Sequence, residues 1–129
     1  MRKKGFLVVL EGTDGSGKAT QTAMLNELLE RWLGQETRRI SFPRYGNPMA
    51  GPVEQYLQGR YGTDPSNVNP YAASLFYAID RFDSYATEWG SFYDSGGIIV
   101  ADRYTTSNAV HQGAKLDGTA RWDYLNWLY

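Results

Sequence analysis

The chain contains no cysteine and only one histidine among its 129 residues. The lack of cysteine excludes disulfide bonds and thiolate metal sites, and it is typical of proteins of the cytosol, so we expect a cytoplasmic protein. Neither sign of charge predominates, because 13 basic residues stand against 14 acidic ones. The composition therefore does not favour a nucleic-acid or membrane partner that binds through bulk charge.

Long hydrophobic runs are also missing. The apolar stretch near the N-terminus, Phe6–Leu10, is followed at once by Glu11, so it is too short for an export signal or a membrane span. Hydrophobic residues nevertheless make up 42% of the chain and aromatic residues 15%. This content is enough for a core, and the length predicts a single folded domain over residues 1–129.

A glycine-rich segment directly follows the apolar stretch and reads G-T-D-G-S-G-K-A-T. The glycines allow successive backbone N–H groups to point at phosphate oxygens, and Lys18 adds a mobile positive charge. The helix that follows presents its positive N-terminal end. Strand, loop and helix in this order predict a phosphate-binding loop, whose nucleotide-binding residues are Gly12, Thr13, Asp14, Gly15, Ser16, Gly17, Lys18, Ala19 and Thr20.

Short apolar runs alternate with helical spacings along the rest of the chain. The predicted elements are strands at 6–10, 38–42 and 98–101, and helices at 20–33, 53–57, 70–93 and 122–129. Alternating strands and helices are typical of an α/β fold, in which helices flank a parallel sheet.

Parallel sheets of this kind bind ligands beyond the carboxyl ends of their strands. The phosphate loop follows the first predicted strand, and Phe42 and Tyr45 follow the second. Asp102 and Arg103 follow the third. An aspartate in this position is the expected partner of Mg²⁺, usually through water, and an arginine can neutralise a phosphate. The alternative is a surface salt bridge at a strand end.

Tyr77 and Arg81 lie one helical turn apart, on a different face from Ile79 and Phe82. An aromatic ring and a guanidinium in this arrangement can hold a flat base and an acceptor group. The alternative is a tyrosine packed beneath a surface arginine.

The segments E-G-T-D-G-S-G-K, F-P-R-Y-G, L-F-Y-A-I-D-R and A-D-R-Y-T-T-S-N together resemble those of bacterial thymidylate kinases, in the same order and spacing over residues 6–112. The resemblance implies a P-loop NTPase fold and transfer of the ATP γ-phosphoryl group to thymidine monophosphate (dTMP), a step of dTTP biosynthesis. ATP, Mg²⁺ and dTMP are the ligands that it implies, and a homodimer is the family's usual assembly.

The resemblance also implies individual roles. Lys18, Asp102 and Arg103 would be the catalytic residues, with Asp102 at the metal and Arg103 bridging the donor and acceptor phosphates. In the acceptor site Asp14 would meet the sugar 3′-hydroxyl, Phe42 and Tyr45 would line the pocket, Tyr77 would stack on thymine, Arg81 would bind the base or a nearby phosphate, and Asn108 would lie over the base and sugar.

Two features depart from the family pattern. Ala19 stands where a hydroxyl residue would ligate Mg²⁺, and the sequence stops at Tyr129 inside an apolar helical pattern. We therefore expect residues 1–129 to be the N-terminal part of a larger kinase, without its lid and later strands, and to be inactive alone. Two alternatives stay open: a related deoxynucleoside or nucleoside monophosphate kinase with another acceptor, for which Glu11 is the only candidate base near the loop, and a nucleotide-binding module without turnover.

Overall fold

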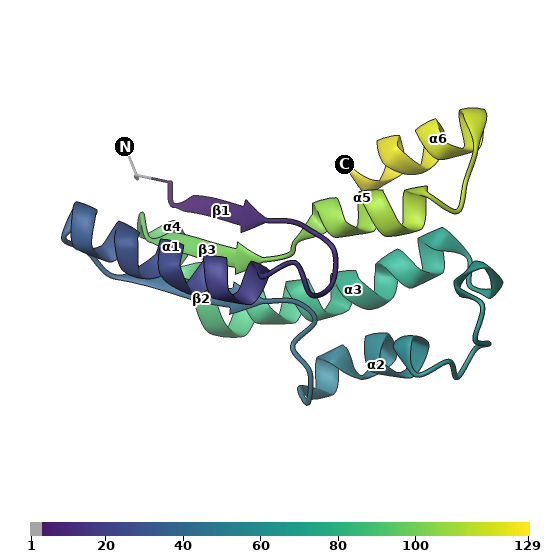
Figure 1. Ribbon diagram of the computed structural model, residues 1–129, viewed down its shortest axis with the longest axis horizontal. Coiled ribbons are helices and arrows are strands. Elements are labelled where there is room, and N and C mark those ends of the chain that lie inside the picture. The colour runs from purple at the N-terminus through teal and green to yellow at the C-terminus, as the bar shows by residue number, and fades with distance from the viewer. Residues whose placement is uncertain (1–3) are drawn as a thin grey trace. The chain divides into compact units, whose positions relative to one another are not determined.

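The computed structural model describes residues 4–129, which form two compact units. The first, here the sheet unit, contains the residues up to Phe42 together with Asp83–Tyr104. The second, here the helical unit, contains Pro43–Phe82 and Thr105–Tyr129. Figure 1 traces the chain through both units from purple to yellow.

The sheet unit is built on three parallel strands: β1 (Phe6–Leu10), β2 (Thr37–Ser41) and β3 (Ile98–Asp102), in the order β1-β3-β2. Leu10 lies opposite Asp102 and so does Ser41, so the three strands end at the same edge of the sheet. The predicted α/β fold with a parallel sheet is confirmed, and the predicted strands agree with the observed ones to within a residue.

The central strand explains why the sheet forms. Residues Ile98–Ala101 are buried, as expected for a continuous apolar run with a neighbouring strand on each side. Helix α1 (Lys18–Leu33) packs against β2 and β3 (Figure 1). It ends at Gly34, whose positive φ of 62° lets its N–H bond the carbonyl of Glu30.

The helix predicted from 70 to 93 is interrupted by a wider turn. Helix α3 (Pro70–Ser84) leads into a π-helical turn, η3 (Tyr85–Trp89), and then into α4 (Gly90–Asp94). A π turn contains an extra residue and so rotates the following side chains by roughly 100°. Trp89, the last residue of the turn, is buried at 3% exposure, and its indole N–H donates to Ser84 Oγ at 3.0 Å.

The predicted apolar stripe along this helix is therefore not one buried face. Before the π turn, Leu75 is 52% exposed and Phe82 is 74% exposed, whereas Trp89 at the end of the turn is buried. Apolar side chains of α1 are exposed as well, including Trp32 at 77%. Within residues 4–129, no helix has the length and apolarity needed to cross a membrane.

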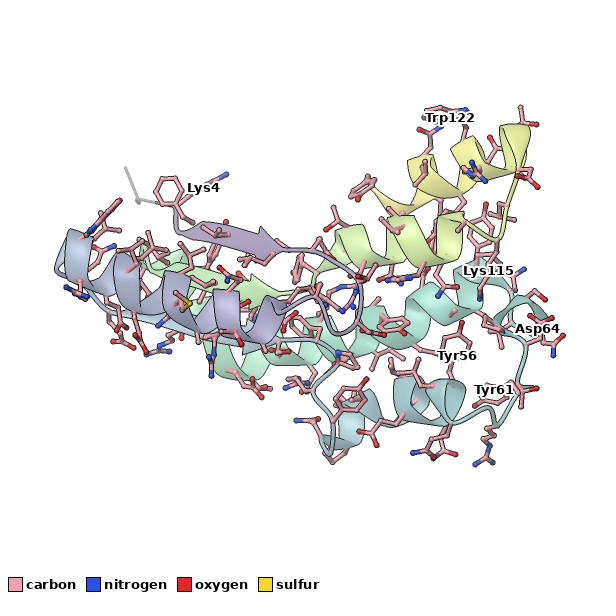
Figure 2. The ribbon with its side chains drawn as sticks, in the orientation of Figure 1. Lys4, Tyr56, Tyr61, Asp64, Lys115 and Trp122 are labelled. Atoms are coloured by element: carbon pink, nitrogen blue, oxygen red, sulfur yellow. The ribbon has the colours of Figure 1, made fainter. Side chains whose placement is uncertain are left out.

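The helical unit contains α2 (Gly51–Leu57), α3 as far as Phe82, α5 (Thr105–Gly113) and α6 (Gly118–Leu128). Helix α5 was not predicted, because T-T-S-N-A-V-H-Q-G has few apolar residues and no clear helical spacing. Helices α5 and α6 pack together (Figure 1). After α5, the Lys115 ammonium donates to the Tyr56 hydroxyl at 3.0 Å and thereby joins this segment to α2 (Figure 2).

Gly97 precedes β3 where there is no room for a side chain. A Cβ atom there would meet the Phe92 ring and lie 2.6 Å from the Phe92 carbonyl oxygen. We expect Gly97→Ala to lower the free energy of unfolding by about 1–3 kcal/mol, the usual cost of overpacking. Urea unfolding measures this cost. The control is Gly51→Ala, because a Cβ at Gly51 meets nothing within 4 Å; equal losses in both variants would contradict the prediction.

Candidate active site

The predicted phosphate loop lies between β1 and α1, as the sequence indicated. Gly15 and Gly17 have φ values of 73° and 89°, a backbone region that favours glycine. The Ser16 N–H donates to the Thr13 carbonyl at 3.2 Å, and the Lys18 ammonium donates to the same carbonyl at 2.8 Å. Gly17 begins α1 without a side-chain cap. The loop is thus closed on itself, and its lysine is held beside the backbone.

Hydrogen bonds from backbone N–H groups connect the segment after β3 to the start of this loop. The Arg103 N–H donates to the Leu10 carbonyl at 3.0 Å, and the Tyr104 N–H donates to Glu11 Oε1 at 3.0 Å. Arg103 Nη2 donates to Asp14 Oδ1 at 2.7 Å. The structure therefore brings together Asp14 and Arg103, two predicted site residues that are 89 positions apart in the sequence.

Arg103 has an unusual backbone conformation. Its φ is 67°, and it is the only residue other than glycine with a positive φ among residues 4–129. Such a conformation is uncommon for a residue with a side chain and often occurs at functional sites. The Arg103 side chain is only 15% exposed, although its partner Asp14 is fully exposed. The fold thus holds this guanidinium at the strand end at some cost in backbone energy.

Phe42 belongs to the core of the sheet unit. It is 6% exposed, its N–H donates to the Asp102 carbonyl at 3.1 Å, and its ring lies 5.8 Å from that of Tyr104. Tyr45, in the helical unit, is 70% exposed. That these two residues line an acceptor pocket stays a prediction.

In the helical unit, the structure pairs two more of the predicted residues. Arg81 Nη1 donates to Asn108 Oδ1 at 2.7 Å, which joins α3 to α5. Tyr77 and Arg81 are half-buried, whereas Ile79 and Phe82 are exposed, so the two pairs occupy different faces of α3 as predicted. That Tyr77 and Arg81 hold a base and an acceptor group stays a prediction.

A buried ion pair next to Arg81 was missed in the sequence. Asp80 is 1% exposed; it accepts from the Arg44 Nε at 2.7 Å and from the Arg44 backbone N–H at 2.9 Å. Arg44 Nη2 also donates to the Asp80 carbonyl at 3.1 Å. This pair fixes the segment that carries Tyr45 to the helix that carries Arg81. The sequence signal for this ion pair was the opposite charge of Arg44 in F-P-R-Y and Asp80 in A-I-D-R.

Gln112 is another buried residue that was not predicted from the sequence. It is 3% exposed, and its Oε1 has no hydrogen-bond partner among the described residues. Gln112 lies one turn after Asn108 on α5, so the two amides share a face. A buried polar atom without a partner costs free energy and often marks a place where a ligand or water binds. The four-residue spacing from Asn108 was the signal in the sequence.

A metal ion would depend mainly on ligands from outside the protein. Within the described part of the chain, no three His, Cys, Asp or Glu side chains are close enough to hold one. Mg²⁺ prefers oxygen ligands and keeps several waters, so one carboxylate beside nucleotide phosphates is sufficient. The half-buried Asp102, at the end of β3, fits that role, whereas Ala19 offers no oxygen.

In this parallel sheet, the first strand leads through a glycine-rich loop into a helix, and Asp102 and Arg103 stand at the end of the neighbouring strand. This arrangement defines the P-loop NTPase class of α/β proteins. The family model for thymidylate kinase matches residues 10–125. The chain belongs to the thymidylate kinase family.

Individual relatives agree with this assignment. The chain is 33% identical to the thymidylate kinase of Mycobacterium tuberculosis over 126 residues, which cover 95% of this chain and 56% of that protein. It is 35% identical to the thymidylate kinase of Leifsonia xyli over 115 residues, which cover 87% of this chain and 50% of that protein. The chain thus spans about half the length of these curated relatives.

Solved structures show the same fold. The thymidylate kinase of Candida albicans superposes with a TM-score of 0.71 at 23% identity, over 97% of this chain and 56% of that one. The thymidylate kinase of Ehrlichia chaffeensis gives a TM-score of 0.67 at 22% identity, over 98% of this chain and 66% of that one.

The strained backbone at Arg103 leads to a prediction about stability. Arg103→Ala and Arg103→Gly both remove the side chain that binds Asp14, and they differ only in backbone preference. Because a positive φ favours glycine, we expect the glycine variant to be more stable by about 1 kcal/mol. Urea unfolding of the two variants side by side measures the difference. An alanine variant as stable as the glycine variant would show that the conformation is not strained.

Proposed function

We propose that the protein containing this chain transfers the γ-phosphoryl group of ATP to dTMP and yields the diphosphate. The observation that carries the proposal is the joining of the phosphate loop to the segment after β3, through the 2.7 Å contact between Arg103 and Asp14. In a family of kinases, this arrangement supplies both the donor phosphate site and a cation next to it. The chain's membership of the thymidylate kinase family supports the choice of acceptor.

The donor half of the site is the phosphate loop with Asp102. The N–H groups of residues 12–20 bind the ATP phosphates, and the Lys18 ammonium exchanges the Thr13 carbonyl for a phosphate oxygen. A magnesium ion held by Asp102 through water would neutralise charge on those phosphates. Ala19 lacks a hydroxyl, so its side chain would not contribute a ligand to this ion.

The acceptor half uses the residues that the family resemblance assigns to the acceptor nucleotide. In the helical unit, Tyr77 stacks on the thymine ring while Arg81 and Asn108 bind its polar edge, next to the Tyr45 segment. The partnerless Oε1 of Gln112 can accept a hydrogen bond from a base N–H. In the sheet unit, Phe42 supplies apolar lining and Asp14 meets the sugar hydroxyl.

Catalysis in this proposal consists of positioning and charge neutralisation, because phosphoryl transfer needs little covalent chemistry from the protein. Arg103 bridges the two phosphates. Its backbone and side chain are both held, by Leu10 and Asp14 respectively, so the guanidinium loses little freedom when the substrates bind. Lys18 binds the donor phosphates both before and during transfer.

The alternative of a deoxynucleoside kinase has less support. Such an enzyme needs a carboxylate to take a proton from the acceptor hydroxyl, and Glu11 is the nearest to the loop. Glu11 Oε1 instead accepts from the Tyr104 N–H at 3.0 Å and so helps to fasten the two strand ends. Formation of thymidine diphosphate from ATP and dTMP by the whole protein separates the proposed function from a module that only binds nucleotide.

The exposed apolar side chains of α3 support a homodimer, which we include in the proposal together with a cytoplasmic location. Leu75, Ile79 and Phe82 follow one another at helical spacing and are 52%, 40% and 74% exposed. Apolar stripes of this kind on a helix are typical of interfaces with another protein.

Lys18 provides the first test of the proposed function. We expect Lys18→Ala to lower kcat/KM by at least about a hundredfold, the scale of losing one group that stabilises transition-state charge. A coupled assay with ATP and dTMP measures the rate, and circular dichroism checks folding. The matched control is Lys4→Ala, because Lys4 is an exposed lysine outside the loop (Figure 2). Near-normal turnover in Lys18→Ala would refute the role given to the loop.

Tyr77 provides a test of the acceptor. Tyr77→Ala should weaken dTMP binding by roughly 1–3 kcal/mol, the range measured for a base stacked on an aromatic ring. ATP binding should be almost unchanged. Tyr77→Phe keeps the ring and should retain most of the affinity. Calorimetry with each nucleotide measures both constants, and equal losses for ATP and dTMP would show that Tyr77 only supports the core.

A further inference from the structure

Three buried polar side chains form a cluster in the helical unit. They come from three helices: Ser74 from α3, Asn108 from α5 and Tyr124 from α6. Their exposures are 1%, 3% and 0%. Polar side chains buried this deeply need partners, and these three contact one another and the backbone. The Ser74 hydroxyl also donates to the Pro70 carbonyl at 2.7 Å.

The hydroxyl of Tyr124 is the inner end of the cluster. It donates to the backbone carbonyl of Asn108 at 3.0 Å and lies 2.8 Å from Ser74 Oγ. A tyrosine hydroxyl keeps its proton at neutral pH and so remains a donor, and burial raises the pKa of this one further. The Tyr124 ring is packed against the rings of Tyr71 and Trp127, at centroid distances of 5.4 Å and 6.1 Å. These contacts fix the direction of the hydroxyl.

The cluster also fixes which way the Asn108 amide points. Asn108 Oδ1 accepts from Arg81 Nη1 at 2.7 Å, and Asn108 Nδ2 lies 3.5 Å from Ser74 Oγ. A guanidinium can only donate, so the asparagine must present its oxygen to Arg81. The Ser74 oxygen on the other side can accept from the amide nitrogen, which favours the same orientation. With the amide turned over, Nδ2 would face the donating guanidinium.

Arg81 is the outer end of the cluster, because it is half-buried whereas Ser74, Asn108 and Tyr124 are buried. A guanidinium side chain is long and loses much rotamer freedom when it is held in place. An acceptor of fixed orientation therefore reduces what a ligand has to order when it binds. The series Tyr124, Ser74, Asn108, Arg81 connects a helix with no predicted site residue to a side chain proposed to bind the acceptor nucleotide.

We propose that Tyr124 and Ser74 are positioning residues that keep the Asn108 amide oxygen toward Arg81 and thereby preset Arg81 for the acceptor nucleotide. Ser74 Oγ contacts the amide nitrogen, and the Tyr124 hydroxyl holds Ser74 and the Asn108 backbone carbonyl in place. The identity of the ligand as dTMP rests on the proposed function, whereas the positioning itself does not. We expect the effect on the acceptor alone, because none of these four side chains belongs to the phosphate loop.

Removal of single hydroxyls tests the proposal in the whole protein. Tyr124→Phe and Ser74→Ala should each raise the KM for dTMP by about three- to tenfold, the loss expected for one hydrogen bond, with kcat and the KM for ATP unchanged. The matched control is Tyr71→Phe, because Tyr71 packs on the same ring but its hydroxyl does not contact Asn108. In an Asn108→Ala background, Tyr124→Phe should have no further effect on the KM for dTMP.

A readout without any nucleotide separates this proposal from the proposed function. In ¹H–¹⁵N spectra of the ligand-free protein, Tyr124→Phe and Ser74→Ala should shift the side-chain amide signals of Asn108, and Tyr71→Phe should leave them in place. If those signals do not move, or if the KM values for ATP and dTMP rise equally, the positioning role is overturned. If the wild-type protein does not bind dTMP, the proposed function is overturned, and the amide signals still decide the positioning role.

Discussion

The alignment of β1 with β3 is the constraint on which the sheet unit depends. Because the strands are parallel and Leu10 lies opposite Asp102, the residues after both strands emerge at one edge. The Arg103 N–H then reaches the Leu10 carbonyl, and Glu11 reaches the Tyr104 N–H. A shift of register by one residue would turn these side chains to the other face and separate them. The contact between Arg103 and Asp14 exists only because the register is fixed.

The helical unit is organised by buried polar contacts around α3. Asp80 holds Arg44 on one side, and Arg81 holds Asn108 on the other, so two neighbouring residues of α3 bind two different segments. Burying charge costs free energy unless each charge is matched, and here the backbone N–H of Arg44 and its guanidinium both serve Asp80. Such contacts are directional, which apolar packing is not. They therefore orient the side chains that we propose to bind the acceptor.

Local patterns predicted the elements well where one physical signal dominated. The apolar run before a glycine-rich loop identified β1 and the start of α1, and the buried run at 98–101 identified β3. The prediction was wrong where the backbone departed from a regular period: the π turn at Tyr85–Trp89 rotates the helix, so a stripe that continues in sequence is divided in space. Helix α5 was missed because its polar sequence has little propensity and depends on α6 for packing.

The sequence by itself determined which chemistry is available, because residue types and their spacing decide that a loop can bind phosphate and that Asp102 and Arg103 end a strand. Only the tertiary structure decided which of these residues meet. The contact between Asp14 and Arg103 spans 89 positions, and that between Ser74 and Tyr124 spans 50. Such pairs leave no periodic trace in a single sequence, because strand register and helix packing bring them together. The same reason explains why the partnerless oxygen of Gln112 and the positive φ of Arg103 became visible only in the folded chain.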